Sequence, residues 1–217
     1  MSKNNHCGKM KERNSRNNTR CYNLGNYIIF TDTKCTEKNY IDGLYESLSE
    51  KLREHLLIRT FKTRTEKLVE ECKNKTSLEP QFAEPWIVFD RDQVQNFDEI
   101  IDEALRKGIN VGWSNPCIES WFEAYFGKMN SYISSKKCCE HFAEQYKKKT
   151  GKVYSKSDKQ IYSILNKYGN QNKAIELAET YLKNHKNANR NLPSEMIPST
   201  TLHKLIKYIV NKTIIDY

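Results

Sequence analysis

The sequence predicts an α/β protein with a mostly parallel sheet that is flanked by helices and followed by a helical carboxyl-terminal region. Between residues 26 and 127, short apolar runs alternate with amphipathic segments of helical period. Strands and helices in alternation are typical of a parallel sheet covered by helices. From about residue 128 onward only helical patterns follow, so we expect no further strand there.

The first expected strand lies in the run NYIIF, over residues 27–30. A helix is expected to begin near Glu37 with Thr36 as its N-cap, because threonine is a favoured capping residue. Its apolar side chains recur every fourth residue along one face, at Tyr40, Leu44, Leu48, Leu52 and Leu56. This period predicts one helix that continues to about Leu56.

The rest of the expected sheet comes from three more apolar runs. We expect strands over residues 57–61, 86–90 and 109–113. Helical patterns follow them over residues 65–74, 96–107 and 115–126; Gly108 closes the second and the turn at Asn115-Pro116 opens the third. Four further helices are expected over residues 135–149, 157–168, 171–187 and 200–212.

The chain is expected to divide into three parts. Residues 1–25 form a basic, mobile arm, residues 26–127 form the α/β core, and residues 128–217 form a helical region that packs on this core. The arm carries six lysine and arginine residues against one glutamate. Such a polar segment has too little apolar surface to offset the entropy lost on ordering.

The charge of the chain favours polyanionic partners. It has 36 lysine and arginine residues against 27 aspartate and glutamate residues, a formal net charge of +9 and an isoelectric point near 9.1. Nucleic acid is the first candidate for a partner of this kind. Phe142, Tyr146 and Tyr154 lie among six lysines of residues 136–152, which leaves open either a nucleic-acid face or an ordinary solvated helix. The eight glycines form no phosphate-binding loop.

The cysteines indicate a reducing compartment. There are seven, an odd number, scattered from Cys7 to Cys139. Cys138, Cys139 and His141 are close in sequence but lack the Cys-x2-Cys spacing of a zinc knuckle, so we interpret them as part of a helix with part-buried thiols. No apolar run approaches the ~20 residues that span a bilayer, and the first residues lack an apolar signal region. We expect a cytoplasmic protein with no membrane partner.

Acidic residues lie at or just beyond the carboxyl ends of the expected strands. Asp90 and Asp92 close the third strand, Asp32 follows the first, and Glu119 lies just beyond the fourth. The carboxyl ends of parallel strands meet at one edge, where ligands bind. Residues two apart in a strand leave the same face, so Asp90 and Asp92 are expected side by side, although a solvated loop is the alternative for both. Hard oxygen ligands at such an edge suit Mg²⁺ or Mn²⁺.

Four motifs occur in a specific order. The stretch DTKCTEKNYIDGL keeps Thr36, Glu37, Tyr40, Gly43 and Leu44 of a pattern that follows the first strand, and it is followed by VFDRD, by SNPCIESW and by a late PSTTLHKLI. Over residues 26–212 this order resembles the RloB family, which is encoded in bacterial restriction and phage-defence loci and whose core resembles the Toprim fold.

The resemblance implies a metal-dependent nuclease that hydrolyses phosphodiester bonds in an anti-phage defence system, with RNA, including transfer RNA, favoured over DNA as the substrate. It implies that one or two Mg²⁺ or Mn²⁺ ions are held by Asp32, Asp90, Asp92 and Glu119. Asp32 or Glu37 is the candidate general base, although Glu37 could instead favour the helix dipole. The candidates for substrate contact are Lys34, Ser114 and Asn115, and a capped Asn-Pro turn explains the last two without chemistry. The resemblance also implies an AAA or ABC-type ATPase partner, and a homo-oligomer is left open.

Three positions depart from the family pattern. Asp32 replaces a glutamate, Thr33 replaces the glycine after it, and Tyr125 stands where a histidine is usual. These departures motivate a second hypothesis, in which the chain is a catalytically degenerate nucleic-acid-binding or regulatory subunit of an ATPase-containing defence complex. A third hypothesis is DNA binding through the basic arm, with a steep salt dependence and no need for Asp90 or Asp92.

Overall fold

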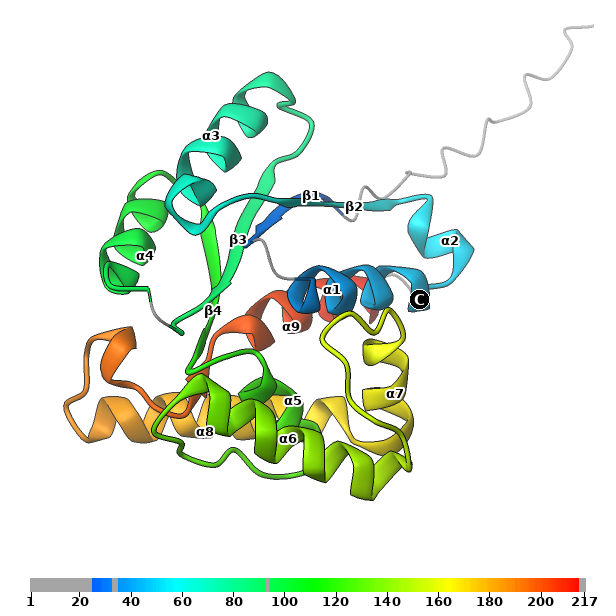
Figure 1. Cartoon of the computed structure of the whole chain (residues 1–217). Coiled ribbons are helices and arrows are strands. Elements are labelled where there is room, and N and C mark those ends of the chain that lie inside the picture. The colour runs from blue at the N-terminus through cyan, green and yellow to red at the C-terminus, as the bar shows by residue number, and fades with distance from the viewer. Residues whose placement is uncertain (1–24, 33–34, 93, 215–217) are drawn as a thin grey trace, which may run out of the picture.

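The computed structural model describes residues 25–32, 35–92 and 94–214, and in this part of the chain five strands and nine helices make up the fold (Figure 1). The strands are β1 (Gly25–Thr31), β2 (Leu56–Lys62), β3 (Glu84–Asp90), β4 (Asn110–Asn115) and β5 (Ser199–Thr200). The helices are α1 (Thr36–Ser47), α2 (Glu50–Arg53), α3 (Leu68–Leu78), α4 (Phe97–Arg106), α5 (Glu119–Tyr125), α6 (Ser135–Thr150), α7 (Ile161–Tyr168), α8 (Gln171–Asn187) and α9 (Leu202–Ile214). Two 3-10 turns, η1 (Thr65–Lys67) and η2 (Pro193–Glu195), complete them.

The strands form one sheet in the order β2-β1-β3-β4-β5. β1 pairs in parallel with β2 and β3, β3 pairs in parallel with β4, and only β5 among the described strands runs antiparallel. The predicted α/β class with a mostly parallel sheet is therefore confirmed. Because four strands point the same way, their carboxyl ends meet at one edge of the sheet.

Helices cover both faces of the sheet. Alternate residues of β1 enter two different hydrophobic clusters, with Tyr27 and Ile29 in one and Ile28 and Phe30 in the other. The cluster with Ile28 is closed by α3 and α4, and the cluster with Tyr27 is closed by α1 and by the helices from α5 to α9 (Figure 1). The apolar runs of the sequence reflect strands that are buried on both faces.

The first predicted helix is shorter than its period of four suggests. α1 ends at Ser47, Leu48 has an extended backbone, and Ser49 caps the separate helix α2 by accepting a hydrogen bond from the Leu52 amide at 3.3 Å. Leu56, the last residue of the predicted stripe, begins β2. Leu48 and Leu52 pack on the same cluster as α1, so burial preserves the apolar period across a break in the helix.

The start of α1 also differs from the prediction. Cys35 occupies the N-cap position, and Thr36 lies inside the helix. The Thr36 hydroxyl instead donates to the backbone carbonyl of Lys156 at 3.2 Å. Thr36 therefore connects α1 to the loop between α6 and α7, rather than capping its own helix.

β5 was not predicted. Its two residues pair with the end of β4, Thr200 opposite Ser114 and Ser199 opposite Asn115. The Thr201 hydroxyl accepts a hydrogen bond from the Trp113 amide at 2.9 Å and donates to the Val111 carbonyl at 3.0 Å. The Thr201 side chain thus continues the pairing with β4 after β5 ends. A strand of two residues leaves no periodic pattern in the sequence, which explains why it was not predicted.

The predicted carboxyl-terminal helices are present with small shifts at their starts. α7 begins at Ile161 rather than near residue 157, and α9 begins at Leu202. Residues of α6 to α9 belong to the same hydrophobic cluster as Tyr27 and Ile29 of β1. The predicted basic arm lies outside the described residues except for Gly25, which begins β1. None of the helices in the described part of the chain has the length and apolar character needed to cross a membrane.

Candidate active site

Four carboxylates come from the carboxyl edge of the sheet and the helices beside it. Asp32 follows β1, Asp90 is the last residue of β3, Glu37 lies in the first turn of α1, and Glu119 begins α5. All four are buried, with at most 7% of any of these residues exposed. We call these four residues the acid cluster. Carboxylates so deeply buried need a compensating charge, a proton or a set of hydrogen bonds.

Glu37 is held close to the other members of the acid cluster. Burial and the nearby charge of Asp32 raise the pKa of Glu37 to about 7, with a smaller contribution from Glu119, while its own backbone and the Asp90 carboxyl act in the opposite direction. Among the described residues, neither carboxylate oxygen of Glu37 has a partner at hydrogen-bond geometry. The Asp90 carboxyl is therefore a near neighbour without a well-formed hydrogen bond to Glu37.

Glu119 is balanced by residues from the loop between α6 and α7. Its Oε1 atom accepts a hydrogen bond from the Tyr154 hydroxyl at 2.9 Å and lies 3.3 Å from Lys156 Nζ. Burial acts to raise the pKa of Glu119, but the Lys156 charge, the Cys117 thiol and Tyr154 outweigh it and lower the pKa below its ordinary value. Its Oε2 atom is buried and has no hydrogen-bond partner in the described part of the chain.

Lys156 was not among the predicted site residues. It lies in the loop between α6 and α7, outside the four motifs quoted above, and this loop is joined to α1 by the hydrogen bond between Thr36 and the Lys156 carbonyl. Burial is the largest single effect and lowers the pKa of Lys156, but Glu119 and Cys139 together outweigh it, so the pKa is raised and the ammonium remains charged. No local sequence pattern could have placed this lysine beside Glu119.

Asp92 is positioned differently from Asp90. β3 ends at Asp90, and Asp92 has a φ angle of +30°, so the strand alternation that placed both side chains on one face does not reach it. Its amide donates to the Pro116 carbonyl at 3.0 Å, which ties the turn after β3 to the turn after β4. The side-by-side arrangement was predicted for an extended backbone that is absent here, and metal binding by Asp92 stays a prediction.

The predicted substrate-contacting residues have different positions. Ser114 Oγ lies 3.1 Å from Thr200 Oγ1 of β5, and Asn115 Nδ2 donates to the carbonyls of Pro193 and Ser194 at 3.0 and 3.1 Å. Both side chains thereby connect β4 to the segment around β5. Lys34 and Thr33 lie outside the described residues. The proposed substrate contacts of Lys34, Ser114 and Asn115 remain predictions.

A second group of potential metal ligands also includes Glu119. Its members are Cys117, Glu119 and Cys139, whose ligand atoms all lie within 4.8 Å of one another. Cys117 Sγ and Cys139 Sγ are 4.0 Å apart. Neighbouring thiols and burial raise the pKa of both cysteines. The grouping joins residues from two motifs that the sequence analysis treated separately, because only the packing of α5 against α6 brings them together.

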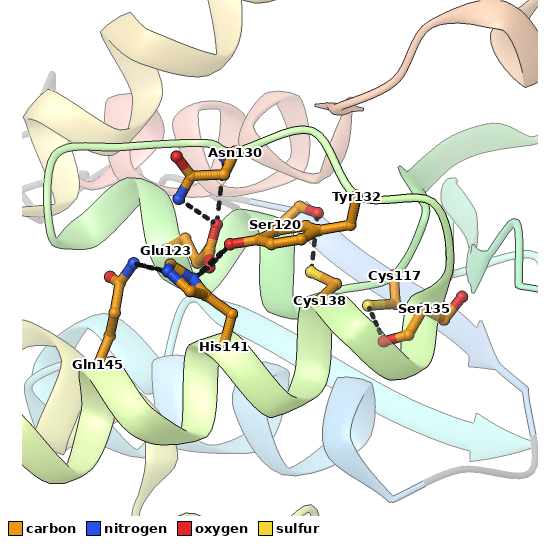
Figure 2. A network of polar contacts seen from close by, with 9 residues as sticks. All are labelled: Cys117, Ser120, Glu123, Asn130, Tyr132, Ser135, Cys138, His141 and Gln145. Carbon is orange, nitrogen blue, oxygen red and sulfur yellow. Dashed lines mark hydrogen bonds and ion pairs between the residues drawn. The ribbon is translucent and has the colours of Figure 1, made fainter.

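A polar network holds α5 and α6 together (Figure 2). Glu123 Oε1 lies 2.7 Å from His141 Nδ1 and accepts a hydrogen bond from the Tyr132 hydroxyl, which also contacts His141 Nδ1. The amide of Asn130 donates to Glu123 Oε2 at 3.2 Å, and Gln145 Nε2 lies 3.1 Å from His141 Nδ1. Glu123 is fully buried, so this network supplies the partners that its carboxylate requires.

The fold and the acid cluster define an α/β protein with an acidic site at the carboxyl edge of its parallel strands. Residues 27–209 match the family model described as RloB-like protein, which covers most of the 217 residues. The chain therefore belongs to the RloB-like family, as its motifs predicted. No curated protein and no solved structure matches the chain significantly.

Proposed function

We propose that the protein is a nuclease that depends on Mg²⁺ or Mn²⁺, hydrolyses phosphodiester bonds in a bacterial anti-phage defence system, and acts on RNA in preference to DNA. The observation that carries this proposal is the convergence of Asp32, Glu37, Asp90 and Glu119 in one buried cluster. Membership of the RloB-like family is consistent with a role in defence.

The donor chemistry of the acid cluster suits a hard divalent cation. All of its donor atoms are carboxylate oxygens, the ligands that Mg²⁺ and Mn²⁺ prefer. Both oxygens of Glu37 and one of Glu119 are buried without a hydrogen-bond partner among the described residues, which is a costly arrangement for carboxylates in the absence of a cation. Asp32, Asp90 and Glu119 would hold the ion, with Asp92 as a further ligand from the turn after β3. When bound, the ion supplies charge stabilisation to phosphate oxygens and makes a bound water easier to deprotonate.

Glu37 is the residue best suited to move a proton. Its pKa of about 7 means that both protonation states are populated near neutral pH. A general base works best when its pKa lies close to the working pH. Glu37 would accept a proton from the attacking water and later pass it on.

A basic groove supports a polyanionic substrate. It lies between α8 and α9, has a volume of about 400 Å³, and is lined by Lys183, Lys186, Lys204 and His203 together with Glu179. Burial and the charge of Lys186 lower the pKa of Lys204. Like charges gathered around one groove attract a phosphate backbone. The preference for RNA and the partnership with an AAA or ABC-type ATPase rest on analogy with defence systems.

The second candidate is a regulatory or nucleic-acid-binding subunit that kept the fold and lost the chemistry. Asp32 in place of the family's glutamate favours it, because the shorter side chain withdraws a carboxylate by one methylene. The two functions differ in their need for metal ligands. A regulatory subunit would tolerate neutralisation of Asp90, whereas an enzyme would not.

The test compares wild type, Asp90→Asn and the control Asp102→Asn, which makes the same chemical change at an exposed position of α4. Each is incubated with transfer RNA, single-stranded RNA and plasmid DNA in Mg²⁺, Mn²⁺ or EDTA, alone and with a candidate partner ATPase of the AAA or ABC type. We expect RNA cleavage that needs the metal, is lost in Asp90→Asn and is retained in Asp102→Asn. Cleavage by folded Asp90→Asn at the wild-type rate, or none by any variant under all these conditions, would contradict the proposal.

A further inference from the structure

The donor set of Cys117, Cys139 and Glu119 differs from that of the acid cluster. Two thiols and one carboxylate are gathered within 4.8 Å, with Cys117 from the turn before α5, Glu119 from its first residue and Cys139 from α6. Mg²⁺ avoids sulfur, whereas Zn²⁺ binds cysteine and carboxylate ligands together. This set of two thiols and one carboxylate therefore favours a different class of cation from the one proposed for the acid cluster.

The spacing of the two sulfur atoms matches a tetrahedral ion. With metal–sulfur bonds of about 2.3 Å, two thiolates on tetrahedral Zn²⁺ lie about 3.8 Å apart. Cys117 Sγ and Cys139 Sγ are 4.0 Å apart. The Glu119 oxygen lies within 4.8 Å of both sulfur atoms, whereas tetrahedral coordination brings oxygen and sulfur to about 3.5 Å, so rotation of the carboxylate completes the set. The backbone already places all three ligands close to their bound positions.

Glu119, which also belongs to the acid cluster, has a buried carboxylate oxygen that a cation would satisfy. The residue is fully buried, and its Oε2 atom has no hydrogen-bond partner in the described part of the chain. Its other oxygen is held by Tyr154 and by the Lys156 ammonium. The Lys156 side chain is 49% exposed, so it can swing into solvent and leave its place beside Glu119 to a metal ion.

The contacts around the thiols hold the ligands in place before an ion binds. Cys138 Sγ lies 3.4 Å from Ser120 Oγ, and the Cys117 thiol donates to the Ser135 carbonyl at 3.8 Å (Figure 2). Ser135 Oγ also donates to the Pro116 carbonyl at 3.3 Å. These contacts fix the start of α6 against the start of α5. Supporting contacts of this kind preserve the geometry of metal ligands.

We infer that Cys117, Cys139 and Glu119 form a Zn²⁺ site, in which both thiols lose their protons to solvent and Lys156 withdraws from Glu119. Three protein ligands leave the fourth position of the tetrahedron open to water, as in zinc sites that are not purely structural. Glu119 is shared between this Zn²⁺ site and the acid cluster, so an ion at the thiols takes a ligand from the carboxylates. The inference does not depend on nuclease activity.

The experiment uses the full chain, reduced and freed of metal, and titrates it with Co²⁺ as a spectroscopic probe for Zn²⁺. We expect thiolate-to-cobalt charge-transfer absorption that saturates at one equivalent and disappears when Zn²⁺ is added. The absorption is lost in Cys117→Ser and Cys139→Ser and retained in Cys72→Ser, a buried thiol in the other hydrophobic cluster. Lys156→Met binds Co²⁺ several-fold more tightly, because the competing ammonium is gone.

Asp90→Asn separates this site from the acid cluster. It should retain the thiolate absorption whether or not the wild-type protein cleaves RNA. Cys117 is buried, so a polar substitution there also tests the stability of the fold. Thermal stabilisation by Zn²⁺ is therefore measured in wild type and in Cys139→Ser, because the Cys139 thiol is only partly buried. The site is refuted if wild type gives no thiolate absorption, or if the absorption persists in both serine variants.

Discussion

The hydroxyl groups of Tyr40 in α1 and Tyr125 in α5 lie 2.6 Å apart in the protein interior. The Tyr125 hydroxyl also donates to Gln171 Oε1 at 3.0 Å, and its ring packs edge-on against Trp121. Burial raises the pKa of both tyrosines, so both hydroxyls stay protonated. Tyr125, where the resemblance leads us to expect a histidine, therefore has a structural role that joins three helices.

We predict that Tyr125→Phe destabilises the fold by about 1–3 kcal/mol, because it leaves the buried hydroxyl of Tyr40 with one partner fewer. Denaturant unfolding measures this change. Tyr45→Phe, at a part-buried tyrosine of α1, is the control and should change stability by less than about 0.5 kcal/mol. Equal effects of the two substitutions would contradict the structural role of the Tyr40–Tyr125 pair.

The raised pKa of Glu37 predicts a distinct pH dependence of stability in EDTA. The carboxyl has a pKa of about 7 in the folded chain and an ordinary value of 4.5, so the folded state binds its proton more tightly. The stability from this group is fully present below about pH 4.5 and is lost as the pH rises towards 7. The loss is about 3 kcal/mol at most.

Thermal unfolding of wild type and Glu37→Gln between pH 4.5 and 8 measures this dependence. The comparison of the two proteins is needed because His203 has the opposite effect on stability. Burial lowers its pKa to about 4, so its contribution to the stability of the fold is lost as the pH falls below its ordinary pKa of 6.5. We expect Glu37→Gln to remove the decline towards neutral pH and to leave the acid side unchanged. Parallel curves would show that Glu37 is not held in its protonated state.

Divalent metal should offset the repulsion among the buried carboxylates of the acid cluster. Mg²⁺ binds the folded chain alone, so it raises the melting temperature in proportion to the logarithm of its concentration above the dissociation constant. The stabilisation should be greatest above pH 7, where Glu37 is ionised, and absent in Asp90→Asn. A shift of equal size in Asp90→Asn would place the ion elsewhere, and Asp102→Asn serves as the matched control for non-specific effects of charge.

Gly43 is required by a close approach between α1 and α7. A Cβ atom added at this position would lie 2.8 Å from the Cβ atom of Tyr162, closer than two carbon atoms can pack. We predict that Gly43→Ala costs about 1–3 kcal/mol of stability by overpacking. Glu46→Ala, at an exposed position of the same helix, should change stability little. Unchanged unfolding of Gly43→Ala would mean that the two helices can separate without cost.

Much of the sheet could be predicted because its strands are buried on both faces and read as continuous apolar runs. The break after Ser47 could not, since Leu48 and Leu52 pack on the same cluster as α1 although they lie outside it. β5 escaped prediction because two residues carry no period, and threonine side chains complete its pairing. Local pattern fails where tertiary contacts decide the backbone.

The acid cluster illustrates the same limit. Asp32, Asp90 and Glu119 could be placed at one edge because parallel strands bring their ends together. The positions of Lys156 and Cys139 depend on how the loop after α6 and the helix itself pack on α5, which no spacing in the sequence encodes. Asp92 marks the opposite case, in which a sound rule for strands was applied two residues beyond the end of the strand.

The acid cluster is completed late along the chain. A nascent polypeptide that has emerged from the ribosome as far as residue 118 carries Asp32, Glu37 and Asp90 but lacks Glu119, and the ammonium of Lys156 that balances Glu119 follows still later. More than half of the protein must be translated before all four carboxylates exist in one molecule. A ribosome-bound intermediate that ends before Glu119 therefore has no assembled cluster, and the complete site can form only after synthesis has passed this residue.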